Sequence, residues 1–373
     1  MSVHEIIRLD PSNESIALQR AVNHLRSGQV MVLPTETVYA LSAPATQRGA
    51  VEMLKAMKHL GDKPNWVLHL DRRSRLNQWV VNPGRPAQRL MDKLWPGPLA
   101  LCMEVAKPEI DNFAQAFGHP TTAELLDQNR RVTFRCPDQP FTRDVIERLD
   151  CPLLMVGIAA PPNAGELDAA LNHTELPDIL AIDAGRARYR TSSTLVEVGP
   201  TRWKILREGA IAERTIRRVM EYVVIFICSG NTCRSPMAED LAKGFFAQRL
   251  GIKRDELEAA GWVILSAGAH ATTGLPATRE AQEAIADLGG NLAPHRSRAA
   301  TADLLQRADL VLTMTASLER EILDTLPNMA GKVERLDPET DIADPIGGSI
   351  DIYRRTAAQI KARIEKRLEE FVA

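Results

Sequence analysis

The sequence predicts an α/β protein made of two domains, and three observations support this prediction. The chain has 373 residues, a length that typically accommodates two or three domains. Apolar runs of strand length alternate with longer segments of helical periodicity, which is typical of the α/β class. Between residues 209 and 222 one pattern ends, and a charged stretch, AERTIRRVMEY, leads into a new apolar run. Because this stretch lacks proline and serine, we expect a short helical linker at 213–221, between domains at 1–212 and 222–373.

The expected strands are short apolar runs, and the expected helices lie between several of them. The runs are 29–34, 98–105, 131–136 and 152–159 in the first domain, and 223–228, 262–268 and 308–314 in the second. The clearest helix is the last one, where mostly apolar residues recur at four-residue spacing and charged residues take the other face. The stripe that we expect to pack onto a sheet consists of Ile352, Thr356, Ile360, Ile364 and Leu368.

Composition narrows the class of protein. Hydrophobic residues make up 45% of the chain and charged residues 25%, and the formal net charge of −2 implies no global attraction to nucleic acid or anionic membrane. The polar start lacks the apolar core of a signal peptide, and the run at 223–228 is too short to span a bilayer. Five cysteines, an odd number without dense spacing, indicate reduced thiols. We therefore expect a cytoplasmic protein with no membrane partner.

The strongest functional signal is the segment CSGNTCRSPMAED at 228–240, which follows one apolar run and precedes a helical pattern. Ser235 is the expected N-cap of this helix, and Pro236 suits its first turn. The segment from Cys228 to Arg234 is then a strand-to-helix loop, whose backbone N–H groups can converge on a phosphate at the helix N-terminus. Gly230 permits a tight turn, and the Asn231 side chain can hold the loop by hydrogen bonds.

This loop has the residue types that phosphate transfer to a thiol requires. The helix dipole and the nearby guanidinium favour the thiolate of Cys228, which can attack phosphorus. Arg234 is planar and permanently charged, so it can bind two oxygens of the transition state. A Cys-x5-Arg spacing also occurs by chance, and the alternative is a buried structural cysteine. The preceding strand, the helix that follows and the Gly-Asn pair favour the catalytic interpretation.

With these residues, the chain from about 222 to 373 resembles the low-molecular-weight protein tyrosine phosphatases. The motifs SAG at 266–268, PHRS at 294–297, ADLVLTM at 308–314 and ADPIGGSIDIY at 343–353 carry the likeness. The resemblance implies a doubly wound parallel sheet with the active loop at the carboxyl end of its first strand. It also implies a phosphorylated protein as substrate and no metal or cofactor.

The resemblance further implies roles for individual residues. Asp344, in an Asp-Pro pair, corresponds to the general acid of the family. Cys233 resembles the resolving cysteine that can trap an oxidised nucleophile, and His295 is interpreted as structural rather than catalytic. The implied phosphate-binding positions are Ser229, Gly230, Asn231, Thr232, Cys233 and Ser235.

Thr232 bears on which phosphorylated residue is hydrolysed. It stands where tyrosine phosphatases usually carry a bulkier apolar residue, and threonine there resembles the protein-arginine phosphatases. A phosphotyrosine ring would need aromatic walls, which neither the loop nor residues 344–350 supply. We therefore expect phosphoarginine, with phosphotyrosine as the alternative. Arsenate reduction fits less well, because the Asp-Pro acid is present and no separate redox cysteine pair follows.

Residues from about 13 to 212 resemble a second family, the threonylcarbamoyl-AMP synthases of the YrdC/YciO type. The likeness rests on GQVMVLPTETVYALSAPA at 28–45, LWPGPLALCMEV at 94–105, RVTFRCPDQP at 131–140, PDILAIDAG at 177–185, SSTLVEV at 192–198 and ILREGAI at 205–211. It implies a twisted mixed sheet with a concave nucleotide cleft. An active domain would use ATP with Mg²⁺ in tRNA modification, and the cleft could take a nucleotide or RNA, including double-stranded RNA.

Several positions depart from that family's pattern. Lys58 keeps a phosphate-binding lysine, but the partner arginine is replaced by Leu60, and Lys63 substitutes for it only as a point charge. A Ser-Ala-Asn segment is replaced by Ala160 and Pro162. The cleft positions that the resemblance assigns are Thr35, Lys58, Lys63, Arg135, Ser193 and Thr194. The domain is either a synthase with a divergent cleft or a relic that binds a nucleotide, RNA or a protein; we favour the relic.

Overall fold

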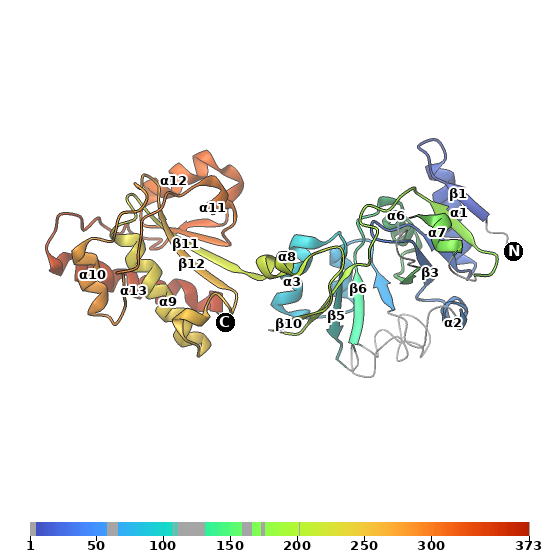
Figure 1. Cartoon of the computed structure of the whole chain (residues 1–373), viewed down its shortest axis with the longest axis horizontal. Helices are drawn as coiled ribbons and strands as arrows, with labels where there is room; N and C mark the ends of the chain where they lie inside the picture. Colours follow the sequence, from blue (N-terminus) through green and yellow to red (C-terminus); the bar gives the residue numbers. More distant parts are fainter. Residues whose placement is uncertain are drawn as a thin grey trace. The chain divides into compact units, whose positions relative to one another are not determined.

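The chain forms two compact units, Met1–Met220 and Glu221–Ala373 (Figure 1). The computed structural model describes residues 5–57, 66–106, 109, 131–158, 166–172, 176–200 and 202–372. The segment expected as a linker forms helix α8 (Glu213–Met220), which buries Ile216 and Met220 in the core of the first unit. Within the described ranges, every helix is too short or too polar to cross a bilayer.

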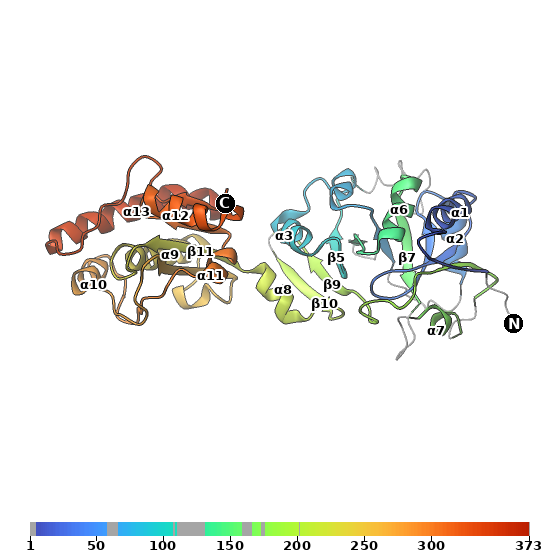
Figure 2. The ribbon, with the colours of Figure 1, turned by 90° about the horizontal axis from the view of Figure 1, so that it is seen from above.

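The first unit contains a mixed sheet, as expected. Its described strands follow the order β1-β8-β2-β3-β7-β4-β6-β5-β9-β10, with parallel and antiparallel neighbours. Figure 2 shows β5, β9 and β10 side by side at one edge. The strands are β1 (Glu5–Arg8), β2 (Met31–Leu33), β3 (Ala40–Pro44), β4 (Val67–His69), β5 (Leu99–Glu104), β6 (Arg131–Arg135), β7 (Leu153–Gly157), β8 (Leu180–Asp183), β9 (Thr194–Val198) and β10 (Trp203–Arg207).

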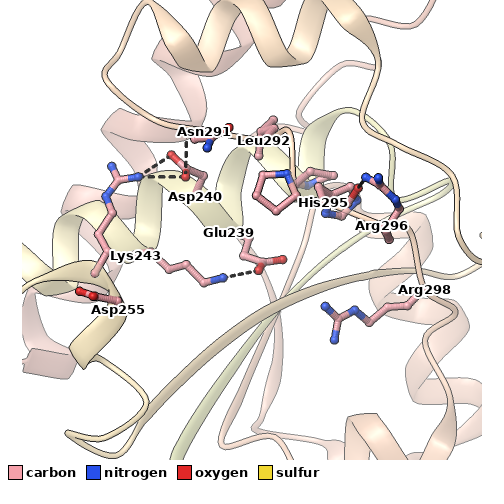
Figure 3. Close-up of a pocket in the computed structure, with 12 residues that line it drawn as sticks. Glu239, Asp240, Lys243, Asp255, Asn291, Leu292, His295, Arg296 and Arg298 are labelled. Atoms are coloured by element: carbon pink, nitrogen blue, oxygen red, sulfur yellow. Dashed lines mark hydrogen bonds and ion pairs between the residues drawn. The ribbon is translucent and has the colours of Figure 1, made fainter.

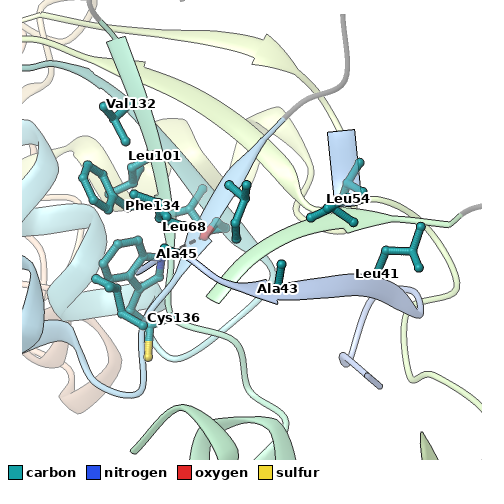
Figure 4. Close-up of a cluster of buried hydrophobic side chains, with 14 of the residues drawn as sticks. Leu41, Ala43, Ala45, Leu54, Leu68, Leu101, Val132, Phe134 and Cys136 are labelled. Carbon is teal, nitrogen blue, oxygen red and sulfur yellow. Dashed lines mark hydrogen bonds between the residues drawn. The ribbon is translucent and has the colours of Figure 1, made fainter. Parts of the chain in front are cut away.

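Both faces of this sheet are covered, because side chains along each strand alternate between two apolar layers. In β2, Met31 and Leu33 enter the layer beneath α1 and α6, whereas Val32 enters the layer beneath α2, α3 and α8. Figure 4 shows part of the second layer, where Phe134 packs among Leu68, Leu101 and Val132. The helices are α1 (Glu14–Arg26), α2 (Arg48–Ala56), α3 (Gly84–Leu94), α6 (Pro140–Leu149) and α7 (Leu167–Asn172), with a 3₁₀ helix at Arg73–Gln78.

The second unit is a doubly wound parallel sheet of the order β12-β11-β13-β14 among its described residues. Val224 and Phe226 of β11 pack in one apolar cluster with α9, α10 and α13, while Val223, Ile225 and Ile227 pack in another with α11 and α12. Figure 1 shows these two groups of helices on opposite sides of β11 and β12. Its strands are β11 (Tyr222–Cys228), β12 (Trp262–Gly268), β13 (Leu310–Thr313) and β14 (Val333–Arg335). Its helices are α9 (Arg234–Leu250), α10 (Arg279–Ala286), α11 (Ala302–Gln306), α12 (Ala316–Thr325) and α13 (Ile350–Val372), with 3₁₀ helices at Arg254–Glu256 and Pro327–Met329.

The buried stripe of α13 differs from the expected one at its first position. Ile360, Ile364 and Leu368 are buried as expected, but Ile352 is 38% exposed and Tyr353 lies in the core instead. An α-helix turns every 3.6 residues, so a strict four-residue row drifts off the buried face. The buried residue at the start of α13 is therefore Tyr353, which lies beneath the loop at 228–234.

Candidate active site

The loop from Cys228 to Arg234 joins the carboxyl end of β11 to α9, as the sequence predicted. It lies close against the neighbouring strand β12. A Cβ atom on Gly268 would lie 2.5 Å from the Ser229 carbonyl oxygen and 2.9 Å from the Asn231 nitrogen. Only glycine leaves room for this approach. The loop is further tied down by the Ala269 and His270 N–H groups, which donate to the carbonyls of Cys228 and Ser229 at 3.0 and 2.9 Å.

Asn231 is the internal anchor of the loop. Its backbone adopts a left-handed conformation (φ 55°), which asparagine tolerates better than most side chains. Its buried Nδ2 donates to Ser235 Oγ and to Ser266 Oγ, both at 2.9 Å. Its Oδ1 accepts from the Arg298 N–H at 2.8 Å. The loop shape is therefore fixed by a fully bonded amide at its centre.

Cys228 sits at the base of the loop, with 2% of its surface exposed. Its Sγ accepts from the Asn231 N–H at 3.2 Å and lies 3.0 Å from Ser235 Oγ. Both groups can donate a hydrogen bond to the sulfur. Ser235 is not the N-cap that we expected. The helix begins at Arg234, and the Ser235 hydroxyl contacts Cys228 Sγ instead.

Arg234 and Asp344 form an ion pair beside the loop. Arg234 is buried, and its Nη1 donates to the Ile342 carbonyl at 3.0 Å while Nη2 bonds Asp344. Among the described residues, its Nε has no hydrogen-bond partner. Asp344 keeps 41% of its side chain exposed and so can meet a substrate. The structure thus brings the three residues predicted as catalytic to one site.

The other expected loop residues divide into two groups. Ser229, Gly230 and Thr232 are half-buried at the surface of the loop, whereas Cys233 is buried behind it. Cys233 Sγ lies 3.5 Å from Tyr353 Oη and 3.6 Å from Thr278 Oγ1. Burial, together with the hydrogen bond to Cys233, raises the pKa of Tyr353 to about 12. Tyr353 is therefore a neutral, structural neighbour of this thiol.

Some residues around the loop were not singled out from the sequence. Ser266 links Asn231 to the buried carboxylate of Glu239, to which its hydroxyl donates at 2.6 Å. His295 lies with Nε2 2.8 Å from the Asn231 carbonyl oxygen, a contact that fits the structural role expected of it. Ser266 falls within the SAG motif, which was the only signal that could have identified it. Glu239 and Tyr353 each fall within a motif, CSGNTCRSPMAED and ADPIGGSIDIY, but nothing in the sequence indicated which residues they contact, because those partners are distant in sequence.

In the first unit, Thr35, Arg135 and Ser193 belong to one buried polar cluster. Arg135 donates to Thr37 Oγ1 at 3.0 Å and pairs with Glu36. Thr37 Oγ1 lies 2.8 Å from Thr35 Oγ1. The Ser193 carbonyl accepts from Arg207 at 3.1 Å, and burial and the nearby Arg135 lower the pKa of Arg207.

Other expected cleft residues do not join this cluster as ligand-binding groups. The Thr194 hydroxyl accepts from the N–H groups of Gly209 and Ile211 at 3.0 and 2.9 Å, so it fastens a loop. Within the described ranges, the buried atoms of the first unit that lack a partner include Glu36 Oε2, His69 Nε2, Arg143 Nε and Arg207 Nε. Burial also lowers the pKa of His69 to about 3, so that side chain is neutral. Lys58, Leu60, Lys63, Ala160 and Pro162 lie outside the described residues.

Comparison with known proteins decides the family of the second unit. A family model described as low molecular weight phosphotyrosine protein phosphatase matches residues 223–373. The protein-arginine-phosphatase of Bacillus subtilis is 38% identical over 143 residues, which are 37% of this chain and 89% of that protein. The chain belongs to the low molecular weight phosphotyrosine protein phosphatase family. A crystal structure of a YwlE mutant from Bacillus subtilis aligns with 41% of this chain and 100% of that one, at 34% identity and a TM-score of 0.37.

The first unit belongs to a second family. A family model described as telomere recombination, of the Sua5, YciO and YrdC proteins, matches residues 23–209. A putative threonylcarbamoyl-AMP synthase of Mycobacterium tuberculosis is 27% identical over 220 residues, which are 57% of this chain and 92% of that protein. This phosphatase-family protein is therefore a fusion of a YrdC-type domain with a protein phosphatase domain.

Proposed function

We propose that the phosphatase domain removes phosphate from protein substrates through a phosphocysteine intermediate, with phosphoarginine as the preferred substrate. The observation that supports this is the placement of Cys228 Sγ under the Asn231 N–H, in the same loop as the buried Arg234. Such a loop can stabilise both the attacking thiolate and the equatorial oxygens of the phosphoryl group. Five free cysteines also fit work in a reducing compartment, which we propose to be the cytoplasm.

The reaction proceeds in two steps. Cys228 Sγ attacks phosphorus, the bond to the leaving nitrogen breaks, and the departing electron pair takes a proton from Asp344. Water then attacks the phosphocysteine, Asp344 accepts its proton, and phosphate leaves as the thiolate returns. Arg234 and the loop N–H groups hold the phosphoryl oxygens throughout. The chemistry needs no metal or cofactor.

The ion pair between Arg234 and Asp344 couples substrate binding to this acid. A phosphoryl dianion competes with the Asp344 carboxylate for the same guanidinium, because each presents two anionic oxygens that a guanidinium can bind. Binding the phosphoryl group therefore releases Asp344 toward the leaving atom.

The surroundings of the loop favour phosphoarginine over phosphotyrosine. Thr232 is polar and β-branched, and the aromatic residue nearest in sequence to Asp344, Tyr353, is 1% exposed with its hydroxyl turned to Cys233. It offers no wall for stacking a phosphotyrosine ring. Ile346, beside Asp344, is 65% exposed and can contact the methylene chain of an arginine. The relative in Bacillus subtilis is named as a protein-arginine-phosphatase.

Enlarging Thr232 tests this preference. Thr232→Ile is expected to lower the ratio of kcat/KM on phosphoarginine to that on phosphotyrosine peptides by about tenfold or more, since one extra methylene changes discrimination by this order. Thr232→Val keeps the shape and removes the hydroxyl, so the pair separates size from polarity. An unchanged ratio in both variants would remove Thr232 as the specificity residue.

Neutralising Asp344 tests the general acid. Asp344→Asn should lower kcat on phosphoarginine peptide by about 10²–10⁴-fold, the usual contribution of a positioned acid. On p-nitrophenyl phosphate, whose leaving group needs no proton, we expect a much smaller loss. Asp341→Asn, an exposed aspartate on the same segment, is the control and should leave both rates near those of the parent. Equal losses on both substrates would contradict the assignment.

For the YrdC-type domain, we propose a binding module for a nucleotide or RNA rather than an active synthase. The cluster around Arg135 has buried polar atoms without partners, which suits a bound ligand. This cluster does not fit the triphosphate of ATP with Mg²⁺, however. The Arg135 guanidinium already bonds Glu36, Thr37 and Gly97, and the unpaired oxygen of Glu36 would repel a phosphate, so this cluster suits the base or ribose of such a ligand and not its phosphate groups.

An assay of pyrophosphate release distinguishes between the two interpretations of this domain, an active synthase and a binding module. With ATP, Mg²⁺, threonine and bicarbonate, the full chain is expected to release no pyrophosphate above background, because the described cluster lacks a free phosphate-binding guanidinium fork. A threonylcarbamoyl-AMP synthase in the same buffer serves as the positive control. Pyrophosphate release that depends on threonine would show an active synthase. Retention of double-stranded RNA or a nucleotide without turnover would support the binding module.

A further inference from the structure

The phosphatase domain contains a second pocket, behind the active loop. Its volume is about 470 Å³, which is sufficient for a small ligand (Figure 3). One wall is the outer face of α9, and the opposite wall is the segment 291–298. The charged side chains that line it are Glu239, Asp240, Lys243, Arg254, Asp255, Arg296 and Arg298.

The two buried acids of this pocket are already neutralised within the protein. Glu239 pairs with Lys243 and accepts from Ser266, and Asp240 accepts from Arg254 at 2.9 and 3.0 Å. Buried carboxylates with such partners have little remaining attraction for a cation.

The uncommitted charge in the pocket is positive. Among the residues that the structure describes, none accepts a hydrogen bond from the Arg298 guanidinium, and Figure 3 shows it pointing toward the Glu239–Lys243 pair. Arg296 is exposed beside it and bonds only carbonyl oxygens of its own loop, those of Ala293 and His295. Asp255, on the other wall, is the remaining acid. The guanidinium of Arg298 therefore offers a fork suited to a small oxyanion, and Arg296 adds positive charge on the same wall.

Two hydrogen-bonded routes connect this pocket to the nucleophile, and both pass through Asn231. The first runs from Lys243 to Glu239, to Ser266 and to Asn231 Nδ2. The second is the Arg298 N–H, which donates to Asn231 Oδ1 at 2.8 Å. The Asn231 N–H in turn donates to Cys228 Sγ. A ligand that holds Arg298 and Lys243 thus acts on the residue that shapes the active loop.

We propose that this pocket is a regulatory site for a small oxyanion of the phosphate class, bound by Arg298 with Lys243 and Arg296. The bound anion places negative charge behind the loop, where it disfavours a second negative charge on Cys228 and on the phosphoryl group. Its effect is therefore inhibitory. Inorganic phosphate, the product of the proposed reaction, is the natural probe, and the kinetic consequence rests on that proposed function.

Calorimetry of inorganic phosphate on the full chain tests the binding part. We expect two sites, one lost in Arg234→Ala and the other weakened about tenfold or more in Arg298→Ala, since a charged hydrogen bond to an anion is worth that order. Arg298→Glu should remove the second site entirely. Arg320→Ala, which removes an exposed arginine on α12 outside the pocket, is the control and should retain both sites.

Inhibition kinetics test the coupling. Phosphate should inhibit the parent chain in a mixed manner, raising KM through the active loop and lowering kcat through the pocket, and Arg298→Ala should convert this to purely competitive inhibition. Purely competitive inhibition of the parent would overturn the regulatory role. One calorimetric site that is lost in Arg234→Ala and unaffected by Arg298→Ala would overturn the pocket itself. A site that responds to Arg298→Ala in a chain without phosphatase activity would support the pocket and count against the proposed function alone.

Discussion

Cys228→Ser is expected to lower phosphate release by at least about 10⁴-fold, the scale on which loss of a catalytic nucleophile reduces kcat. Oxygen replaces sulfur with almost no change in packing, so the fold should be preserved. A serine hydroxyl ionises far less readily than a thiol, and no base lies within hydrogen-bond distance of Cys228 Sγ among the described residues. The loop would then bind phosphate without attacking it.

Acid-quenched turnover gives a direct measurement of the intermediate. Mass spectrometry of the quenched parent should find one phosphoryl group on the peptide that contains Cys228, and Cys228→Ser should show no phosphocysteine. Cys233→Ser is the matched variant, because it makes the same substitution five residues further along the loop. It should keep the adduct on Cys228. An adduct that survives in Cys228→Ser and moves to Cys233 would reassign the nucleophile.

Arg234→Lys should lower kcat/KM by about 10³-fold, the scale of losing a transition-state oxyanion contact. Arg234 uses two separate nitrogens, one on the Ile342 carbonyl and one on Asp344, and these two contacts fix the orientation of its guanidinium. A lysine keeps the charge but has one nitrogen, which cannot span both partners and two phosphoryl oxygens. The loss should appear in kcat as well as in KM, because the transition state has more charge on those oxygens.

Steady-state kinetics on phosphoarginine peptide provide the readout for this variant. Arg335→Lys is the control, since Arg335 also forms an ion pair with an aspartate of the same segment, Asp341, without reaching the loop. It should behave like the parent. If Arg234→Lys retained kcat/KM within a factor of a few, positive charge alone would be sufficient and the forked contact would have no role.

The catalytic loop could be predicted from the sequence because its chemistry is local. Nucleophile and arginine lie in one short segment between a buried strand and a helix, and sequence order alone places them together. The prediction of Ser235 as the N-cap was wrong, because it rested on local propensity alone. Serine is favoured at helix starts by a general propensity, but here the Ser235 hydroxyl lies 3.0 Å from Cys228 Sγ, and a tertiary contact overrides propensity.

The supporting contacts could not be predicted, because they join distant segments. No pattern near Glu239 indicates that it accepts from Ser266, and none near Tyr353 indicates Cys233. In the first unit, strands of three residues such as β4 are too short to show a period. The family resemblance marked Thr194 as a cleft residue, but a motif match does not distinguish a hydroxyl that binds a ligand from one that fastens a loop.

Two contacts of the Cys228–Arg234 loop join segments that are far apart in the sequence, so they can form only late in synthesis of the chain. Cys233 meets a tyrosine 120 residues further along the chain, and Arg234 meets the Ile342 carbonyl 108 residues further along. The loop emerges from the ribosome well before Ile342 and Tyr353 are synthesised, and domains fold as their segments emerge. While it is being synthesised, the nascent chain therefore carries Cys228 and Arg234 before their loop has its distant partners. The contact between Cys233 and Tyr353 forms only when α13 docks, so we expect a chain that ends before α13 to contain the motif without activity.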